Sequence, residues 1–131
     1  MKCFNLKVVT PDGLVFDSEI ESLLVRTDDG DVEFLAGHID YMASLGTGRA
    51  RIKHEGKDRL ASVSGGFVTV KDGQVSLVAI TFEFRENIDL ERAKAARDEA
   101  RDNLSSTDDK TVKLAQAKLQ RALSRINVAE G

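Results

Sequence analysis

Three arginines in the C-terminal third of the chain have the chemistry to bind phosphate oxygens. Arg92, Arg121 and Arg125 carry permanent charges, and each planar guanidinium offers a fork of donors that matches a phosphate group. Arg121 and Arg125 stand four residues apart, so they share one face wherever that stretch is helical. The alternative is a surface network of ion pairs, in which Asp89 caps a helix and Glu83 pairs with the arginines.

The sequence does not contain the motifs that other kinds of functional site require. Gly46–Arg49 resembles part of a phosphate loop but has no Gly-Lys-Ser/Thr ending, which disfavours a site that hydrolyses nucleotide. Asp28–Asp31 is acidic without the spacing or the terminal Glu of a calcium loop. Cys3, His38 and His54 are too scattered for a metal site. No nucleophile–base pair and no paired carboxylates stand out, so we expect a protein that is not itself an enzyme and requires no cofactor.

The segment Ile88–Ala93 separates two parts of different composition. All six Phe and the single Tyr lie at or before Phe84, and the residues after Ile88 are chiefly Ala, Leu and charged side chains. This later composition is typical of a helical pair that must pack on another structure. The segment is therefore a candidate hinge between a domain over residues 1–86 and a second over residues 87–131.

Bulk composition narrows the classes of protein. The chain has 131 residues, of which 41% are hydrophobic and 31% charged, and a net charge of −3. The negative charge disfavours general binding of nucleic acid. No run of about 18 apolar residues is present, so we expect no insertion into a membrane. One cysteine excludes an internal disulfide, and the N-terminus has no signal-peptide pattern, which together favour a bacterial-type cytoplasm.

The first part reads as many short strands separated by turn residues. Phe4, Leu6 and Val8 alternate with polar residues, and Asp72-Gly73 favours a type I′ hairpin. The pair Gly65-Gly66 lies inside a β-rich stretch, which indicates a bulge or a close approach of two backbones. Other strands are expected at 14–16, 20–25, 32–35, 41–45, 49–53, 59–64, 67–70 and 74–80. Even spacing without intervening helices predicts an antiparallel β-sandwich or flattened barrel.

The second part has helical periodicity. Apolar residues repeat at three and four positions along two stretches, the first being Leu90, Ala93, Ala96, Ala100 and Leu104, and the second Val112, Ala115, Leu119, Ala122 and Ile126. Ser106 and Asp109 stand at capping-box spacing before the second stretch. The fold class is therefore α+β, a sandwich followed by an antiparallel αα-hairpin. Its alanine-rich seams bury little area, so the hairpin is marginal alone and is a candidate movable element.

This order of elements resembles the epsilon subunit of bacterial F-type ATP synthase over nearly the whole chain. The resemblance rests on an ordered set of motifs: Val8–Gly13, Gly30-Asp31, Gly37-His38, Ser64–Phe67, Ile88–Ala93 and Arg121–Ile126. The sequence departs from the family where many members carry Pro, at Ala36 and Asp40. The loop around His38 is therefore expected to be less rigid than in those members.

The resemblance implies a non-catalytic rotor part of the central stalk. In the family the sandwich docks on the gamma subunit and on the polar loops of the c-ring. The resemblance therefore implies a peripheral protein at the cytoplasmic side of the bacterial cell membrane. The hairpin either folds onto the sandwich or extends toward the alpha and beta catalytic subunits, where it inhibits ATP hydrolysis. In several members the folded hairpin binds ATP as a regulatory ligand.

The family motif Ile/Leu-Asp-x-x-Arg-Ala stands intact at Ile88, Asp89, Arg92 and Ala93, and implies an ATP site. At this site Arg92 would contact the phosphates, together with Arg121 and Arg125 from the second helical stretch. Ile88 and Ala93 would flank the base, and Glu83 and Asp89 would accept hydrogen bonds or fix the arginines. Two further positions carry over as contacts to the c-ring or gamma subunit, Asp31 and His38, each with an ordinary structural turn as the alternative.

A second function stays open beside the rotor part. The chain could be a free-standing nucleotide-sensing module whose helices bind ATP, with no rotor role. The two functions differ in their partners, because a rotor subunit should co-purify with a gamma subunit and a sensor should not need one. The sequence is compatible with either position of the hairpin.

Overall fold

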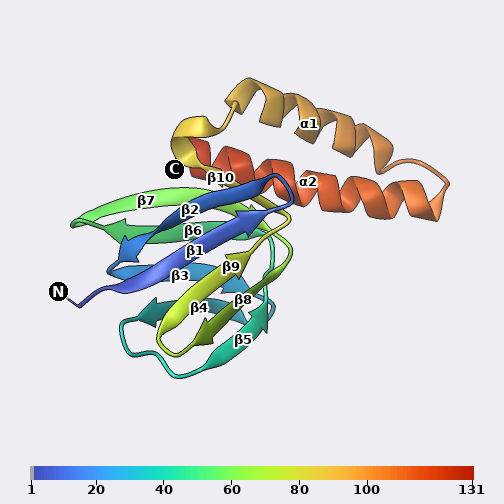
Figure 1. Ribbon diagram of the computed structural model, residues 1–131. Coiled ribbons are helices and arrows are strands. Elements are labelled where there is room, and N and C mark those ends of the chain that lie inside the picture. The colour runs from blue at the N-terminus through green and yellow to red at the C-terminus, as the bar shows by residue number, and fades with distance from the viewer. Residues whose placement is uncertain (1) are drawn as a thin grey trace.

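The computed structural model describes residues 2–131 as a β-sandwich followed by two helices (Figure 1). The strands are β1 (Phe4–Thr10), β2 (Gly13–Ile20), β3 (Ser22–Thr27), β4 (Gly30–Leu35), β5 (Tyr41–Ser44), β6 (Gly48–His54), β7 (Lys57–Ser64), β8 (Phe67–Lys71), β9 (Gln74–Val78) and β10 (Thr81–Phe84). A 3-10 turn, η1 (Arg85–Asn87), leads to α1 (Leu90–Asn103) and α2 (Asp109–Glu130). The predicted α+β class is confirmed.

The strands form two five-stranded sheets. One has the order β2-β1-β9-β8-β5 and the other β10-β7-β6-β3-β4. Adjacent strands are antiparallel, with one exception among the described pairs, because β1 runs parallel to β9. The sheet that contains β1 is therefore mixed, whereas the other sheet is antiparallel throughout.

The core lies between the two sheets. In β1, Phe4, Leu6 and Val8 are buried, as the period-two pattern predicts, and they meet side chains from the facing sheet such as Phe34 and Ile52 in one buried cluster. Burial of apolar area at about 25 cal/mol per Å² makes this cluster the main source of stability. The sandwich thus has its own core and does not depend on the helices for one.

Turn chemistry fixes several connections as predicted. Asp72 and Gly73 both have positive φ, 52° and 77°, which is the type I′ conformation between β8 and β9. At Gly66 the backbone passes so close to β9 that an added Cβ would lie 1.8 Å from the carbonyl oxygen of Val78. One prediction was wrong: the single strand expected at 20–25 is split at Glu21, because Ile20 still pairs with Phe4 while Ser22 pairs with Leu35 in the other sheet.

The helices pack in a layer on one sheet (Figure 1). α2 contacts β6 and β7, and α1 packs against α2. The buried residues of the pair are small, namely Ala93, Ala100, Ala115, Ala122 and Val128. The loop between the helices projects beyond the sandwich, whereas the C-terminal end of α2 lies beside η1.

The start of α2 differs from the predicted capping box. Asp108 is the N-cap, and its carboxylate accepts hydrogen bonds from the Lys110 amide at 3.2 Å and from the Thr111 hydroxyl at 2.8 Å. Ser106 lies before the cap, where its hydroxyl accepts a bond from the Asp108 amide. A carboxylate at the N-cap also faces the positive end of the helix dipole, which stabilises its negative charge in addition to the two hydrogen bonds.

Candidate functional site

A pocket of about 420 Å³ lies where α1 begins, between β10 and the end of α2. Four elements supply its wall, which consists of Glu83, Asn87, Asp89, Arg92, Ala93, Ala96 and Arg125. Five of the seven residues expected at a nucleotide site therefore meet at one cavity. Residues as distant in sequence as Glu83 and Arg125 meet there because α2 folds back beside β10.

Asp89 has a structural role in this pocket. Its Oδ1 accepts a hydrogen bond from the Arg92 amide at 3.1 Å, which makes Asp89 the N-cap of α1. The cap places Arg92 one turn into the helix and Ala93 on the buried face beside it. The small Ala93 side chain, 3% exposed, leaves the cavity open at this point.

Glu83 and Arg125 form an ion pair across the pocket. The Arg125 Nε lies 2.5 Å from the Glu83 Oε1, and both side chains are partly buried. The pair joins α2 to β10, so it is also a contact between the hairpin and the sandwich. The alternative expected from the sequence, an ion pair between Glu83 and an arginine, is present at this position.

The other two arginines have no side-chain partner within residues 2–131. Neither the Arg92 nor the Arg121 guanidinium forms a hydrogen bond or ion pair there. Arg121 lies in an adjoining cavity of about 120 Å³, which shares Ala96 and Arg125 with the first pocket and adds Lys118. The two cavities together present three arginines and one lysine beside the carboxylates of Glu83, Asp89 and Glu99. The guanidinium groups of Arg92 and Arg121, unpaired within the described residues, are the ones that suit an extended anion.

One expected residue lies apart, and several others were missed. Ile88 is half-buried after η1, where its amide bonds the Arg85 carbonyl at 3.2 Å, and it does not line either cavity. Asn87, Ala96 and Lys118 do line them, though the sequence did not single them out for this role. Ala96 shares the predicted helical face with Ala93, so the periodicity alone could have identified it.

The turn η1 that enters the site is tied to the sheet by charge. Arg59 of β7 stacks over the Phe84 ring at 3.7 Å and forms an ion pair with Glu86 of η1. The hydrogen bond from Arg59 lowers the pKa of the Glu86 carboxyl from its ordinary value. The segment before Ile88 is therefore held to the sandwich.

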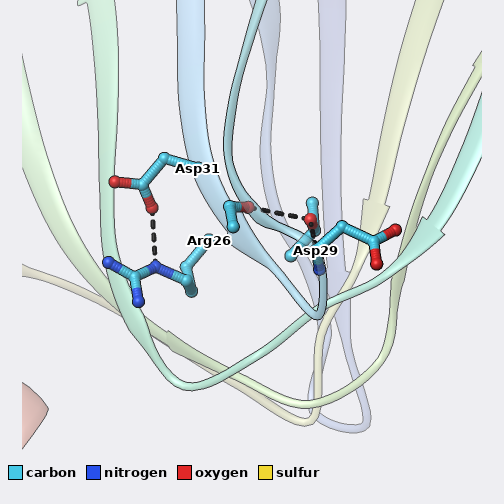
Figure 2. Close-up of polar contacts among 5 residues, drawn as sticks. Arg26, Asp29 and Asp31 are labelled. Carbon is cyan, nitrogen blue, oxygen red and sulfur yellow. Dashed lines mark hydrogen bonds and ion pairs between the residues drawn. The ribbon is translucent and has the colours of Figure 1, made fainter.

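Asp31 does not stand free at the tip of its turn. Figure 2 shows its carboxylate beside Arg26, whose Nε donates to Oδ1 at 2.7 Å across the β3–β4 pair. The Asp29 carboxylate points away from this ion pair, while the Asp29 amide bonds the Thr27 hydroxyl at 3.2 Å. Asp31 instead lines a groove of about 660 Å³ between β3, β6 and α2.

His38 is built into its loop. Nδ1 lies 2.7 Å from the Ile39 carbonyl oxygen, to which a protonated nitrogen donates, and the ring packs near Phe34 and Tyr41. Ile39 and Met42 beside it are 77% and 72% exposed. The apolar surface at this end of the sandwich therefore comes from neighbours of His38 rather than from the histidine itself.

The described part of the chain lacks two other kinds of feature. Residues 2–131 contain no cluster of three His, Cys, Asp or Glu side chains placed to hold a metal ion. Neither α1 nor α2 has the length and apolar character that crossing a membrane requires.

Comparison with known proteins agrees with this architecture. A family model described as the β-sandwich domain of the ATP synthase delta/epsilon chain matches residues 3–85, and one described as its long alpha-helix domain matches residues 86–130. The ATP synthase epsilon chain of Bacillus subtilis (strain 168) is 45% identical over 130 residues, which is 98% of each chain. That of Bacillus pumilus is 40% identical over 129 residues, again 98% of each chain.

Solved structures agree as well. A chain in the Euglena gracilis mitochondrial ATP synthase structure, which contains OSCP, F1 and the c-ring, superposes with a TM-score of 0.85 at 26% identity, covering 98% of this chain and 82% of that one. A chain in the central stalk and c-ring structure of Tetrahymena thermophila shares the fold, with a TM-score of 0.66 at 14% identity, covering 98% and 95%.

A β-sandwich followed by a helical pair, matched along its length by both models, is the architecture of ATP synthase delta/epsilon chains. The chain belongs to this family, and within it to the bacterial epsilon subunits of F-type ATP synthase. The resemblance inferred from the sequence is confirmed.

Proposed function

We propose that the chain is a non-catalytic rotor component that ties the gamma subunit to the loops of the c-ring and restrains ATP hydrolysis through its hairpin. It would lie at the cytoplasmic side of the membrane, held there by its partners. The observation that carries the proposal is the arrangement of surfaces. The hairpin rests on one sheet through small apolar side chains and three polar contacts, and the other sheet has an outer face bearing apolar side chains.

The uncovered sheet supports docking to gamma. Met42 of β5 and Phe67 of β8 point outward on neighbouring strands, 72% and 44% exposed, and Ile39 is 77% exposed in the loop before them. Exposed apolar side chains on adjoining elements are typical of a surface that another protein covers. His38 would support this region through the aromatic rings of Phe34 and Tyr41. Asp31 lies on the other sheet, where its half-exposed carboxylate would remain available to a c-ring loop beside its ion pair with Arg26.

The contact between hairpin and sandwich supports a movable element. Three strands each make one polar contact to α2: Arg49 to Asn127, Ser62 to Ser124 at 2.8 Å, and Glu83 to Arg125. A hydrogen bond of this kind contributes about 0.5–1.5 kcal/mol net, and apolar burial is limited by the small side chains of α2. The folded position can therefore be exchanged for other contacts at modest cost.

The pocket between α1, β10 and α2 supports ATP as the regulatory ligand. Phosphates would meet Arg92, Arg121 and Arg125, and the base would lie against Ala93 and Ala96. A ligand that bridges α1, α2 and β10 would stabilise the folded hairpin, because it binds only when all three elements are together. ATP would then oppose the extended, inhibiting position.

Titration of ATP into the isolated chain tests the ligand. We expect saturable one-site binding that weakens at least about tenfold, or ~1.4 kcal/mol, in Arg92→Ala. Arg97→Ala is the matched control, because Arg97 lies on the same helix and pairs with Asp98 outside the pocket. An absence of saturable binding up to millimolar ATP would contradict the proposal that ATP is the ligand, and the proposed rotor role would be unaffected.

Co-purification tests the rotor role against the alternative. The same pocket is compatible with a free-standing nucleotide sensor, which would bind ATP without any partner. If the chain assembles with its gamma subunit and the complex depends on Phe67 and Met42, the rotor role is supported. If ATP binds but gamma is not retained, the sensor is the better description.

A further inference from the structure

The C-terminal end of α2 has no positive charge of its own. Its last turn carries Glu130 and no basic residue. Backbone carbonyls at a helix C-terminus present a partial negative charge, so an acidic side chain there is unfavourable and a cation is favourable. Considered alone, this turn should fray.

A strand of the sandwich supplies the missing cation. Arg49 of β6 donates from Nη2 to the Asn127 side-chain Oδ1 at 2.8 Å and to the Asn127 carbonyl oxygen at 3.3 Å. The same carbonyl accepts the Gly131 amide at 2.8 Å, the bond that closes the last turn. Arg49 therefore acts as a cap that reaches the helix from another element.

The first helix supplies a second cation. Lys94 of α1 places Nζ 3.6 Å from Oε1 of Glu130. The end of α2 thus receives positive charge from β6 and from α1, and loses both if the hairpin leaves the sandwich and its helices separate. The nearby Arg51 of β6 has a different role, since it pairs with Glu33 of β4.

We propose that the last turn of α2, from Asn127 to Glu130, is a conditional element: it is helical while the hairpin lies on the sandwich and unravels when the hairpin leaves. Arg49 is the positioning residue that links the two events. By the same linkage, the capped turn favours the folded position, because the released hairpin loses the bonds that Arg49 provides.

Unravelling would change the reach of the released hairpin. Four residues rise about 6 Å as a helix and span about 13 Å when extended, so the tail of the released form gains roughly 7 Å. This consequence rests on the proposed movement of the hairpin. The conditional turn itself does not depend on ATP or on a gamma subunit.

Amide exchange measured by NMR on the full-length chain, without nucleotide, tests the cap. In Arg49→Ala we expect exchange at Glu130 and Gly131 to accelerate about threefold or more, with the Cα shifts of 127–130 moving toward coil values. Amides of 115–119 should keep their protection. Arg51→Ala is the matched control and should leave the last turn unchanged. Equal exchange in the two variants, or equal acceleration along all of α2, would overturn the proposal.

A second variant releases the hairpin with Arg49 intact. Ser62 is 5% exposed beneath α2, so Ser62→Tyr should displace the helix from β7, seen as loss of nuclear Overhauser contacts between them. We expect the last turn to unravel in this variant while 115–119 stay helical. A displaced hairpin that keeps the last turn protected would refute the conditional element. Both measurements are independent of ATP binding and of assembly, so they succeed or fail apart from the proposed function.

Discussion

Gly66 illustrates how a single residue can carry a constraint of the whole sandwich. Its φ is 88°, and an added Cβ would meet the Val78 carbonyl oxygen at 1.8 Å. The amide of Leu45 also bonds the Gly66 carbonyl oxygen at 2.9 Å, so this backbone cannot shift without loss of a second contact. Both the backbone conformation and the lack of space require glycine here.

We therefore expect Gly66→Ala to lower the free energy of unfolding by at least about 2 kcal/mol, because strain and overpacking add. Gly73→Ala is the control: it also has positive φ, 77°, but nothing lies within 4 Å of its added Cβ. Strain alone should cost about 1 kcal/mol there. Urea unfolding of the two variants measures the difference, and equal losses would show that space at Gly66 is not limiting.

Glu86 makes stability depend on acid pH. Its pKa is lowered in the folded state by the hydrogen bond from Arg59. The unfolded chain then binds more protons near and below the ordinary pKa of 4.5, so the contribution is present above that pH and is lost as the pH falls through the folded pKa. In Glu86→Gln we expect a smaller drop in unfolding free energy on acidification from pH 5.5.

Chemical denaturation at a series of pH values checks this prediction. Glu19→Gln is a suitable control, since Glu19 is exposed on β2 and forms no ion pair within residues 2–131. Its pH profile should follow that of the parent chain. If Glu86→Gln also followed the parent profile, the Arg59 contact would have no effect on stability.

At the scale of elements, the hairpin position can be fixed covalently. The hydroxyl oxygens of Ser62 on β7 and Ser124 on α2 lie 2.8 Å apart, so the two side chains face each other and are the pair to replace by cysteine. Cys3 would be changed to serine first, since it is the single native thiol. We expect the oxidised pair to hold α2 on the sandwich and to abolish inhibition of ATP hydrolysis in the assembled complex.

Reduction of the same protein is the internal control and should restore inhibition. Ser62→Cys alone, oxidised in parallel, controls for the effect of the reagent. Assays of ATP hydrolysis with and without reductant give the comparison. Inhibition that persists in the oxidised pair would show that α2 need not leave β7 for regulation.

The elements also show which features a sequence can predict. Period-two alternation and Asp72-Gly73 predicted strands and a turn because their causes are local. The parallel β1–β9 pair and the break at Glu21 depend on how distant strands meet, which local pattern does not encode. Ser106 and Asp108 both have capping chemistry, and the sequence pattern favoured the wrong one.

The candidate site likewise has some features that the local sequence predicts and others that depend on the tertiary structure. Arg92 and Asp89 are neighbours in one helical turn, so their motif was visible in the sequence. The Arg26–Asp31 ion pair was not, because it follows from the register of β3 and β4. Lys118 and Ala96 come together only when the helices pair, and Ile88 is excluded by its place after η1.

At the scale of the whole molecule, the two outer faces of the sandwich differ in what covers them. α2 occupies one face, and the other presents Met42 and Phe67. We expect Met42→Glu combined with Phe67→Glu to weaken the complex with gamma at least about tenfold, because two charges would be buried in an apolar contact. Leu14→Glu is the control, since Leu14 is 59% exposed on β2 at the opposite edge of the same sheet.

Surface plasmon resonance with immobilised gamma subunit measures the effect. Circular dichroism of the variants confirms that the sandwich is folded, which is expected because both side chains point away from the core. Equal weakening by Leu14→Glu would place the contact elsewhere on the sheet.

The helix loop that projects past the sandwich makes the hairpin a lever with unequal arms (Figure 1). The 22 residues of α2 extend about 33 Å at 1.5 Å per residue, and its polar contacts fall between Ser124 and Asn127. A force on the loop therefore acts through an arm of roughly 20 Å on bonds that lie near the fulcrum. A neighbouring subunit that binds only the loop between the helices would exert a large torque on the contacts between α2 and the sandwich. A force of the same size applied beside Asn127 would exert almost no torque on them.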